Sequence, residues 1–216
     1  MTAGDDRRAW RTRGVTGPAD SGKSPDRPRG RPLSTGFSLR RPGLVLSSPI
    51  HSIEYHSLGH HRGAGNSITN NEVRGSGENG IQVDDARVPI AGNTVRDSAE
   101  AGILLFNAFN SEVKNNLVRD SGINGIELDI GAGNHVAGNR VFDSEGAGII
   151  AVGFPSQPSE DHRIVDNFVR NSDGDDGIEL TDTTTDNVVI GNEFRRNDED
   201  QIDDDGTNNT VVGNVV

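Results

Sequence analysis

The chain has 216 residues and no cysteine, which excludes disulfides and thiolate metal sites. Its formal net charge of −12 argues against nucleic acid as a partner, because capture of phosphates depends on clustered Lys and Arg. No apolar run reaches the ~18 residues that a membrane-spanning helix needs, so we expect no transmembrane segment.

Residues 1–62 differ in composition from the rest of the chain. They carry 11 Lys and Arg against 5 Asp and Glu, whereas residues 63–216 carry 10 against 28. The stretch from Asp20 to Pro32 has almost nothing to bury, which is typical of disorder. We therefore expect a disordered basic tail over 1–62 and a folded acidic domain over 63–216. The acidic, lysine-poor surface also favours a salt-loving source, because salt screens self-repulsion.

From residue 63 onward the chain repeats a short phrase. An Asn followed two residues later by an apolar residue recurs at spacings of 22 to 28 residues. A Gly-Ile element follows in most copies, and a third short apolar element precedes each new Asn. The Asn positions are Asn71, Asn93, Asn116, Asn139, Asn167, Asn192 and Asn214. Self-similarity at such a period indicates a solenoid.

The elements inside the period predict strands rather than helices. Each one alternates β-branched and polar residues over a few positions and is bounded by Gly, Asn, Asp or Ser. We therefore predict an all-β parallel β-helix with rungs of about 22–25 residues and three short strands per rung. The Asn side chains should stack and hydrogen-bond to one another inside the turns, since an amide both donates and accepts. The apolar column from Val73 to Val216 and the Ile column from Ile81 to Ile202 should fill the interior.

The pattern Asn-x-Val-x-(Asp/Asn)-Ser…Gly-Ile-x-Leu over residues 65–216 resembles the repeats of the pectin-lyase-like superfamily. The resemblance implies a right-handed parallel β-helix and an extracellular or cell-surface location, although the chain shows no convincing signal peptide. That superfamily includes pectate lyases, polygalacturonases, alginate epimerases and phage tailspikes, so the fold leaves the function open. Gly174-Asp175-Asp176 is similar to a polygalacturonase stretch, but the accompanying Asn-Thr-Asp and Gly-His-Gly motifs are absent. The Asp-Pro-His-Glu run of alginate epimerases is also absent.

The strands that carry the Ile column also predict a candidate site on their outer face. Where Ile126 and Leu128 point inward, alternation turns Glu127 and Asp129 outward. Glu179 should lie two rungs away, at about 9–10 Å from Glu127. These three carboxylates are the candidate catalytic residues, and an inserted loop around residues 153–161 should lie beside them. The candidate substrate-binding residues are Leu104, Phe106, Ile150 and Phe154.

Acidic residues also accumulate in the last two rungs. In register, Asp175 should stack on Glu199, Asp176 on Asp200, and Glu179 on Asp203. Like charges directly opposite are destabilising, and Ca²⁺ would relieve the repulsion because it takes six to eight oxygen ligands. Screening by dissolved salt is the alternative explanation. The candidate metal ligands are therefore Asp175, Asp176, Glu179, Glu199, Asp200 and Asp203, with Ca²⁺ as the expected cofactor.

A further outward column follows each repeated Asn by three residues. Its members are Arg74, Arg96, Arg119, Phe142, Arg170 and Arg195. An Arg column at rung spacing could grip the carboxylates or sulfates of an acidic polysaccharide. It could equally form ion pairs with neighbouring acidic residues and hold the rungs together. We expect His135 and His162 to be ordinary surface histidines.

The missing catalytic motifs favour a non-catalytic β-helix module that binds carbohydrate or a surface partner. The first alternative is a polysaccharide lyase, epimerase or glycoside hydrolase that acts near Glu127 and Glu179. The second alternative is a purely structural surface scaffold. The sequence stops within a rung, at Gly213 to Val216, so we also expect possible end-to-end self-association through this rung.

Overall fold

The computed structural model describes the backbone of residues 36–38, 49–50 and 52–56 and the whole of residues 66–216. These residues form short strands, connected by turns, and include no α-helix. None of them therefore forms a helix long and apolar enough to cross a membrane.

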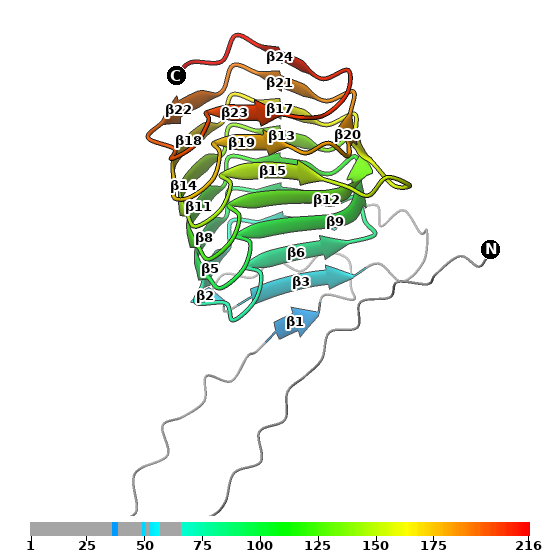
Figure 1. Cartoon of the computed structure of the whole chain (residues 1–216). Coiled ribbons are helices and arrows are strands. Elements are labelled where there is room, and N and C mark those ends of the chain that lie inside the picture. The colour runs from blue at the N-terminus through cyan, green and yellow to red at the C-terminus, as the bar shows by residue number, and fades with distance from the viewer. Residues whose placement is uncertain (1–35, 39–48, 51, 57–65) are drawn as a thin grey trace, which may run out of the picture. The chain divides into compact units, whose positions relative to one another are not determined.

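The strands are arranged in three sheets, which we call A, B and C (Figure 1). Among the described residues, sheet A has ten strands: Gly36–Ser38 (β1), Ser52–His56 (β3), Ile81–Asp84 (β6), Ile103–Phe109 (β9), Ile126–Ala132 (β12), Ile149–Val152 (β15), Ile178–Leu180 (β19), Ile202–Asp204 (β23), and the two short additions Ser159–Glu160 (β16) and Thr184–Thr185 (β20). The first eight lie side by side in that order, and β16 pairs with β12 and β20.

Sheets B and C have seven strands each within the same residues. Sheet B consists of Pro49–Ile50 (β2), Glu72–Arg74 (β5), Thr94–Ser98 (β8), Leu117–Ser121 (β11), Arg140–Ser144 (β14), Phe168–Ser172 (β18) and Glu193–Arg195 (β22). Sheet C consists of Ile68–Thr69 (β4), Pro89–Ala91 (β7), Glu112–Lys114 (β10), His135–Ala137 (β13), Arg163–Val165 (β17), Val188–Ile190 (β21) and Thr210–Val212 (β24).

From residue 66 the chain visits sheet C, then B, then A, and repeats this circuit. Every pairing between named strands is parallel and joins equivalent positions of successive rungs, for example Ile103 to Ile126 to Ile149. The predicted all-β parallel β-helix is therefore confirmed. Strands β1, β2 and β3 lie within the segment that the sequence assigned to a tail, and they continue sheets A and B. The boundary at residue 62 stays a prediction, and the rest of residues 1–65 lies outside the described residues.

The interior contains the predicted apolar columns. Val73, Val95, Val118, Val141, Val169 and Phe194 are buried, as are Ile81, Ile103, Ile126, Ile149 and Ile178. Only the last members differ, since Ile202 is half-buried and Val216 is exposed. The glycine of the Gly-Ile element is required by close packing: a Cβ on Gly125 would collide with the Val141 side chain and the Gly148 carbonyl oxygen.

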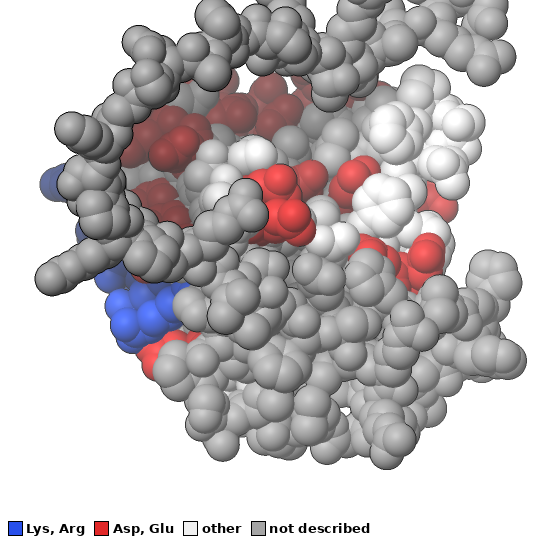
Figure 2. Space-filling model, turned by 90° about the horizontal axis from the view of Figure 1, so that it is seen from below, with Lys and Arg blue, Asp and Glu red and all other residues white. Residues whose placement is uncertain are grey.

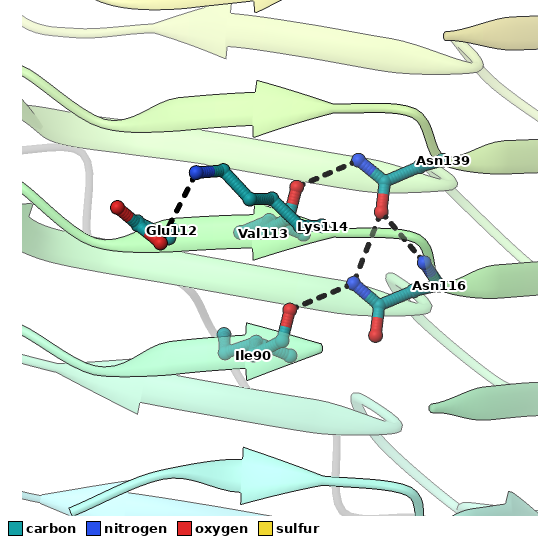
Figure 3. Close-up of polar contacts among 6 residues, drawn as sticks. All are labelled: Ile90, Glu112, Val113, Lys114, Asn116 and Asn139. Atoms are coloured by element: carbon teal, nitrogen blue, oxygen red, sulfur yellow. Dashed lines mark hydrogen bonds and ion pairs between the residues drawn. The ribbon is translucent and has the colours of Figure 1, made fainter. Parts of the chain in front are cut away.

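The repeated Asn side chains form the predicted ladder inside the turn between sheets C and B (Figure 3). The Asn139 amide nitrogen donates to the Val113 carbonyl oxygen at 2.8 Å and to Asn167 Oδ1 at 3.0 Å. Its Oδ1 accepts both the backbone N–H and the side-chain amide of Asn116, at 2.9 and 3.0 Å. The same bonds recur from Asn71 to Asn214. Each rung is thus held in register by the side chain of the next one.

A second polar ladder, which the sequence did not reveal, fills the turn between sheets A and C. Its members are Ser111, Asn134, His162, Asn187 and Asn209, and each accepts the backbone N–H of the preceding member or of a neighbour in register. The prediction that His162 is a surface residue is wrong, because its side chain is buried. His162 Nδ1 accepts the Asn134 N–H at 3.1 Å, and Nε2 lies 2.9 Å from Ser159 Oγ. His135 is half-exposed on β13.

The inward and outward assignments can be tested with one substitution placed on adjacent rungs. In sheet A, Ile126 pairs with Ile149 of the next rung, and Ile150 is the residue after Ile149. Ile126 therefore points inward and Ile150 points outward. We expect Ile126→Asp to reduce the free energy of unfolding by more than ~3 kcal/mol, because it buries an unpaired charge. Ile150→Asp should cost less, about 2 kcal/mol or less, because the new carboxylate stays in contact with water although Glu127 and Glu179 stand on either side of it. Urea unfolding measures both, and equal costs would contradict the assignments.

The buried imidazole predicts a specific pH dependence. Burial lowers the pKa of His162 to about 4, well below its usual 6.5. Between these values the unfolded chain binds a proton that the folded protein does not, so stability is lost as the pH falls from about 6.5 to about 4. The loss amounts to roughly 3 kcal/mol. His162→Asn places the side chain of its ladder neighbours at this position and should remove this component. The measurement is the wild-type minus variant difference in unfolding free energy at pH 7.5 and pH 4. An unchanged difference would contradict this role.

Candidate functional site

The outer face of sheet A carries two columns of side chains. The first contains Gln82, Leu104, Glu127, Ile150, Glu179 and Asp203, which are in register across successive strands. The second contains Asp84, Phe106, Asp129 and Val152. From Leu104 to Glu179, apolar and acidic residues thus alternate along the axis of the β-helix. The structure brings Glu127, Asp129, Leu104, Phe106 and Ile150 together as the sequence predicted.

Glu127 lies half-buried between two apolar neighbours, Leu104 below and Ile150 above in register. Burial raises the pKa of its carboxyl, and the charges of Asp129 and Glu100 act in the same direction. A hydrogen bond from Asn124 opposes that shift: its Nδ2 donates to Glu127 Oε2 at 3.0 Å. Burial also raises the pKa of Asp129. Both groups therefore hold a proton more readily than exposed carboxyls do.

The extra residues of the longest rung form a tight turn after β15. Phe154 and Gln157 exchange backbone hydrogen bonds of 2.9 Å, and the chain returns as β16 beside Gly131 of β12. Phe154 is 53% exposed, which leaves its ring free to contact a ligand. The turn therefore lies near the carboxyl-terminal ends of β12 and β15, beyond Asp129. On the far side of the turn, Ser159 Oγ donates to the Leu128 carbonyl oxygen at 3.1 Å and lies 2.9 Å from His162 Nε2. His162 therefore holds this side of the turn through Ser159.

Glu179 is separated from Glu127 by Ile150 alone, so the two carboxylates lie two rungs apart, or about 9–10 Å by strand spacing. Burial raises the pKa of Glu179 to about 7, helped by the charges of Asp175, Asp176, Asp203 and Asp205. A substantial fraction of Glu179 is therefore protonated near neutral pH.

Asp176 explains part of that shift. The equivalent residue two rungs earlier is Asn124, whose Oδ1 accepts the Ala147 N–H at 3.0 Å while its amide nitrogen faces Glu127. Asp176 accepts the Asp200 N–H at 2.6 Å in the same way. A carboxylate oxygen thus replaces the amide donor beside the glutamate of this rung. Burial and the surrounding carboxylates raise the pKa of Asp176 to about 6.

Three of the predicted metal ligands converge. Oxygen atoms of Asp175, Asp176 and Glu199 lie within 4.8 Å of one another, and Asp176 is buried. Among the described residues, Asp200, Asp203 and Glu179 do not belong to this group, although Glu179 and Asp203 are paired in register. Oxygen ligands suit Ca²⁺. Binding of Ca²⁺ at this cluster stays a prediction.

A hollow of about 580 Å³ lies at the turn between sheets B and A. It is lined by Gly75, Ser76, Asp97, Ser98, Ala99, Asp120, Ser121, Gly122, Asp143, Glu145 and Asp173. None of the predicted site residues lines it. The candidate site on sheet A is thus a surface strip along the helix rather than an enclosed pocket.

Sequence reasoning missed the residue that orients Glu127. Asn124 and Asn79 each precede the Gly of a Gly-Ile element, and both donate to the first outward side chain of the following strand. The signal was present as an amide one residue before that glycine in alternate rungs, with Ala101 between the two Asn residues and Ala147 in the rung after Asn124. It was not recognised because these Asn residues stand outside the main Asn column.

The fold has known relatives. The pattern of the family described as the right-handed β-helix region matches residues 59–216, so the chain belongs to this family. The A-module of mannuronan C-5 epimerase AlgE6 from Azotobacter vinelandii is similar with a TM-score of 0.65 and 18% identity, over 76% of this chain and 48% of the epimerase structure. The T265N mutant of the periplasmic alginate epimerase AlgG gives a TM-score of 0.58 and 16% identity, over 77% and 50%.

This chain therefore spans about half the length of the solved structures that it resembles. At these identities the similarity shows a shared fold. A comparison with curated protein sequences gives no match.

Proposed function

We propose that the outer face of sheet A binds a polysaccharide without transforming it. The main support for this proposal is the position of Glu127. Its side chain is half-buried between Leu104 and Ile150 and accepts a hydrogen bond from Asn124. Carbohydrate sites combine apolar surface, which contacts sugar ring faces, with a few well-placed polar groups that bind hydroxyls. Glu127 and Asp129 supply hydroxyl acceptors, and Phe106, 38% exposed, supplies an aromatic surface.

The charge of this face favours a neutral glycan. Strands β6, β9, β12, β15, β19 and β23 contain no Lys or Arg, while they contribute several carboxylates. A uronan would place its own carboxylates against Glu127 and Asp129, and like charges at close range are unfavourable. The similarity to alginate epimerases supports polysaccharide as the ligand class. The local electrostatics support an uncharged member of that class.

The second candidate is catalysis by Glu127 and Glu179. The raised pKa of Glu179, about 7, favours this reading, because a general acid must be protonated at the working pH. Glu127 would then act as the base, at a separation close to the upper end of the range for inverting glycosidases. The absent Asp-Pro-His-Glu, Asn-Thr-Asp and Gly-His-Gly motifs support binding over catalysis.

A glycan panel with product detection separates the two candidates. We expect Glu127→Gln to weaken retention on a neutral glycan by about tenfold, because a charge-assisted acceptor for sugar hydroxyls becomes a neutral amide. No product should form with either protein. Glu112→Gln is the matched control, since Glu112 lies exposed on sheet C in an ion pair with Lys114 (Figure 3), and it should leave retention unchanged.

Two results would overturn the proposal. Product formed by the wild type and abolished by Glu127→Gln or Glu179→Gln would establish the catalytic alternative. Unchanged retention after Glu127→Gln and Phe106→Ala together would show that the face of sheet A is solvated surface, as expected of a structural scaffold.

A further inference from the structure

The outer face of sheet B has a chemistry opposite to that of sheet A. Its strands place Arg74, Arg96, Arg119, Phe142, Arg170 and Arg195 in one column, in register from rung to rung. Arg140 and Phe168 stand in the adjacent column, also in register. In the view from below, Lys and Arg side chains gather on the left, where Figure 1 shows the strands of sheet B (Figure 2). A cationic strip therefore runs along an otherwise acidic β-helix.

The centre of this strip is a single aromatic ring surrounded by cations. The guanidinium carbons of Arg119, Arg140 and Arg170 lie 5.9, 5.4 and 5.5 Å from the centroid of Phe142. Phe168 meets the same ring edge-on at 5.6 Å, and Arg195 lies over Phe168 at 5.6 Å. Cation–π contacts of this kind fix the position of a guanidinium group without neutralising its charge.

Carboxylates neutralise only part of this strip. Arg119 pairs with Asp143 at 3.4 Å, and Arg195 pairs with Glu193 at 2.7 Å. Within the part of the chain that the structure describes, Arg140 and Arg170 form no ion pair. The Nε atoms of Arg119 and Arg170 are buried and make no hydrogen bond. Ion pairing between rungs therefore does not account for the whole column.

This arrangement has an electrostatic cost that a ligand would remove. Like charges on neighbouring strands are destabilising, and here three guanidinium groups share one ring. A carboxylate or sulfate group suits guanidinium because it accepts two parallel hydrogen bonds. The rungs repeat every ~4.8 Å, so the best ligand carries negative groups at regular intervals along an extended chain. Phe142 and Phe168 are half-buried and can offer apolar contact to the faces of sugar rings.

We propose that the outer face of sheet B, centred on Phe142, binds an acidic polysaccharide that lies along the helix axis. Arg140 and Arg170 bind its carboxylates, Arg119 adds a third contact, and the two phenylalanines contact sugar rings. A single polysaccharide chain can follow this strip, whereas double-stranded DNA is wider and would meet the acidic surface on either side, which contributes to the net charge of −12.

This surface is distinct from the strip on sheet A, which suits an uncharged glycan. The proposal for sheet A and the proposal for sheet B can therefore be disproved independently of each other. Glu127→Gln should leave binding of an acidic polysaccharide unchanged, and substitutions on sheet B should leave binding of a neutral glycan unchanged.

The test measures the affinity of the full chain for oligomers of alginate by calorimetry at low and high salt. We expect Arg140→Gln with Arg170→Gln to weaken the affinity by about tenfold, because two charged contacts are lost. The matched control is Arg87→Gln with Arg163→Gln, which removes the same charge from two exposed residues outside sheet B and should change the affinity less than about twofold. Phe142→Leu preserves most of the apolar bulk but removes the ring that positions the three guanidinium groups, so it should weaken binding.

Sulfated dextran, unmodified dextran and double-stranded DNA serve as comparison ligands. Binding of sulfated dextran that the Arg140 and Arg170 substitutions weaken equally would support the same site with sulfate as its anion. The proposal is overturned if alginate does not bind, if both double variants lose affinity equally, or if DNA binds as tightly as alginate.

Discussion

The hydrogen-bonded ladder of buried Asn side chains is the constraint on which the rest of this structure depends. Each amide accepts from the rung on one side and donates to the rung on the other, so no rung can slip without leaving a buried polar group unpaired. A one-residue slip would also turn each inward Ile outward. The ladder therefore fixes both the register of the strands and the identity of the residues that face solvent.

Fixed register converts a sequence repeat into surfaces with defined chemistry. In each rung, the residue after the inward Ile points outward. These residues, such as Leu104, Glu127 and Ile150, together form the acidic and apolar strip of sheet A. The third residue after each repeated Asn is likewise outward and builds the Arg column of sheet B. Because the inward residues supply most of the stability of the fold, the outward residues can differ from one rung to the next. The two faces can thus hold opposite charge on one scaffold.

Most of the fold could be predicted from the sequence, because a pattern that recurs in several rungs is clear even where the assignment of a single short segment is ambiguous. The Asn and Ile columns recur in nearly every rung, and their period identifies both the strands and the inward side. Single departures from the pattern could not be read in the same way. His162 was misplaced because one imidazole replaces an Asn in a ladder that also contains a Ser, so no single residue type marks its positions in the sequence. The role of Asp176 depends on a contact with the following rung, 24 residues away, that no local pattern encodes.

Hydrogen exchange of the ladder amides tests the central claim most directly. Side-chain amide protons of Asn116 and Asn139 can be followed by NMR, with the exposed Asn110 as an internal reference. If the ladder holds the rungs, these protons should exchange only when the helix unfolds, and so more slowly than those of Asn110 by roughly a thousandfold or more. Exchange of Asn139 at the rate of Asn110 would show that its amide is open to water, and would contradict the account.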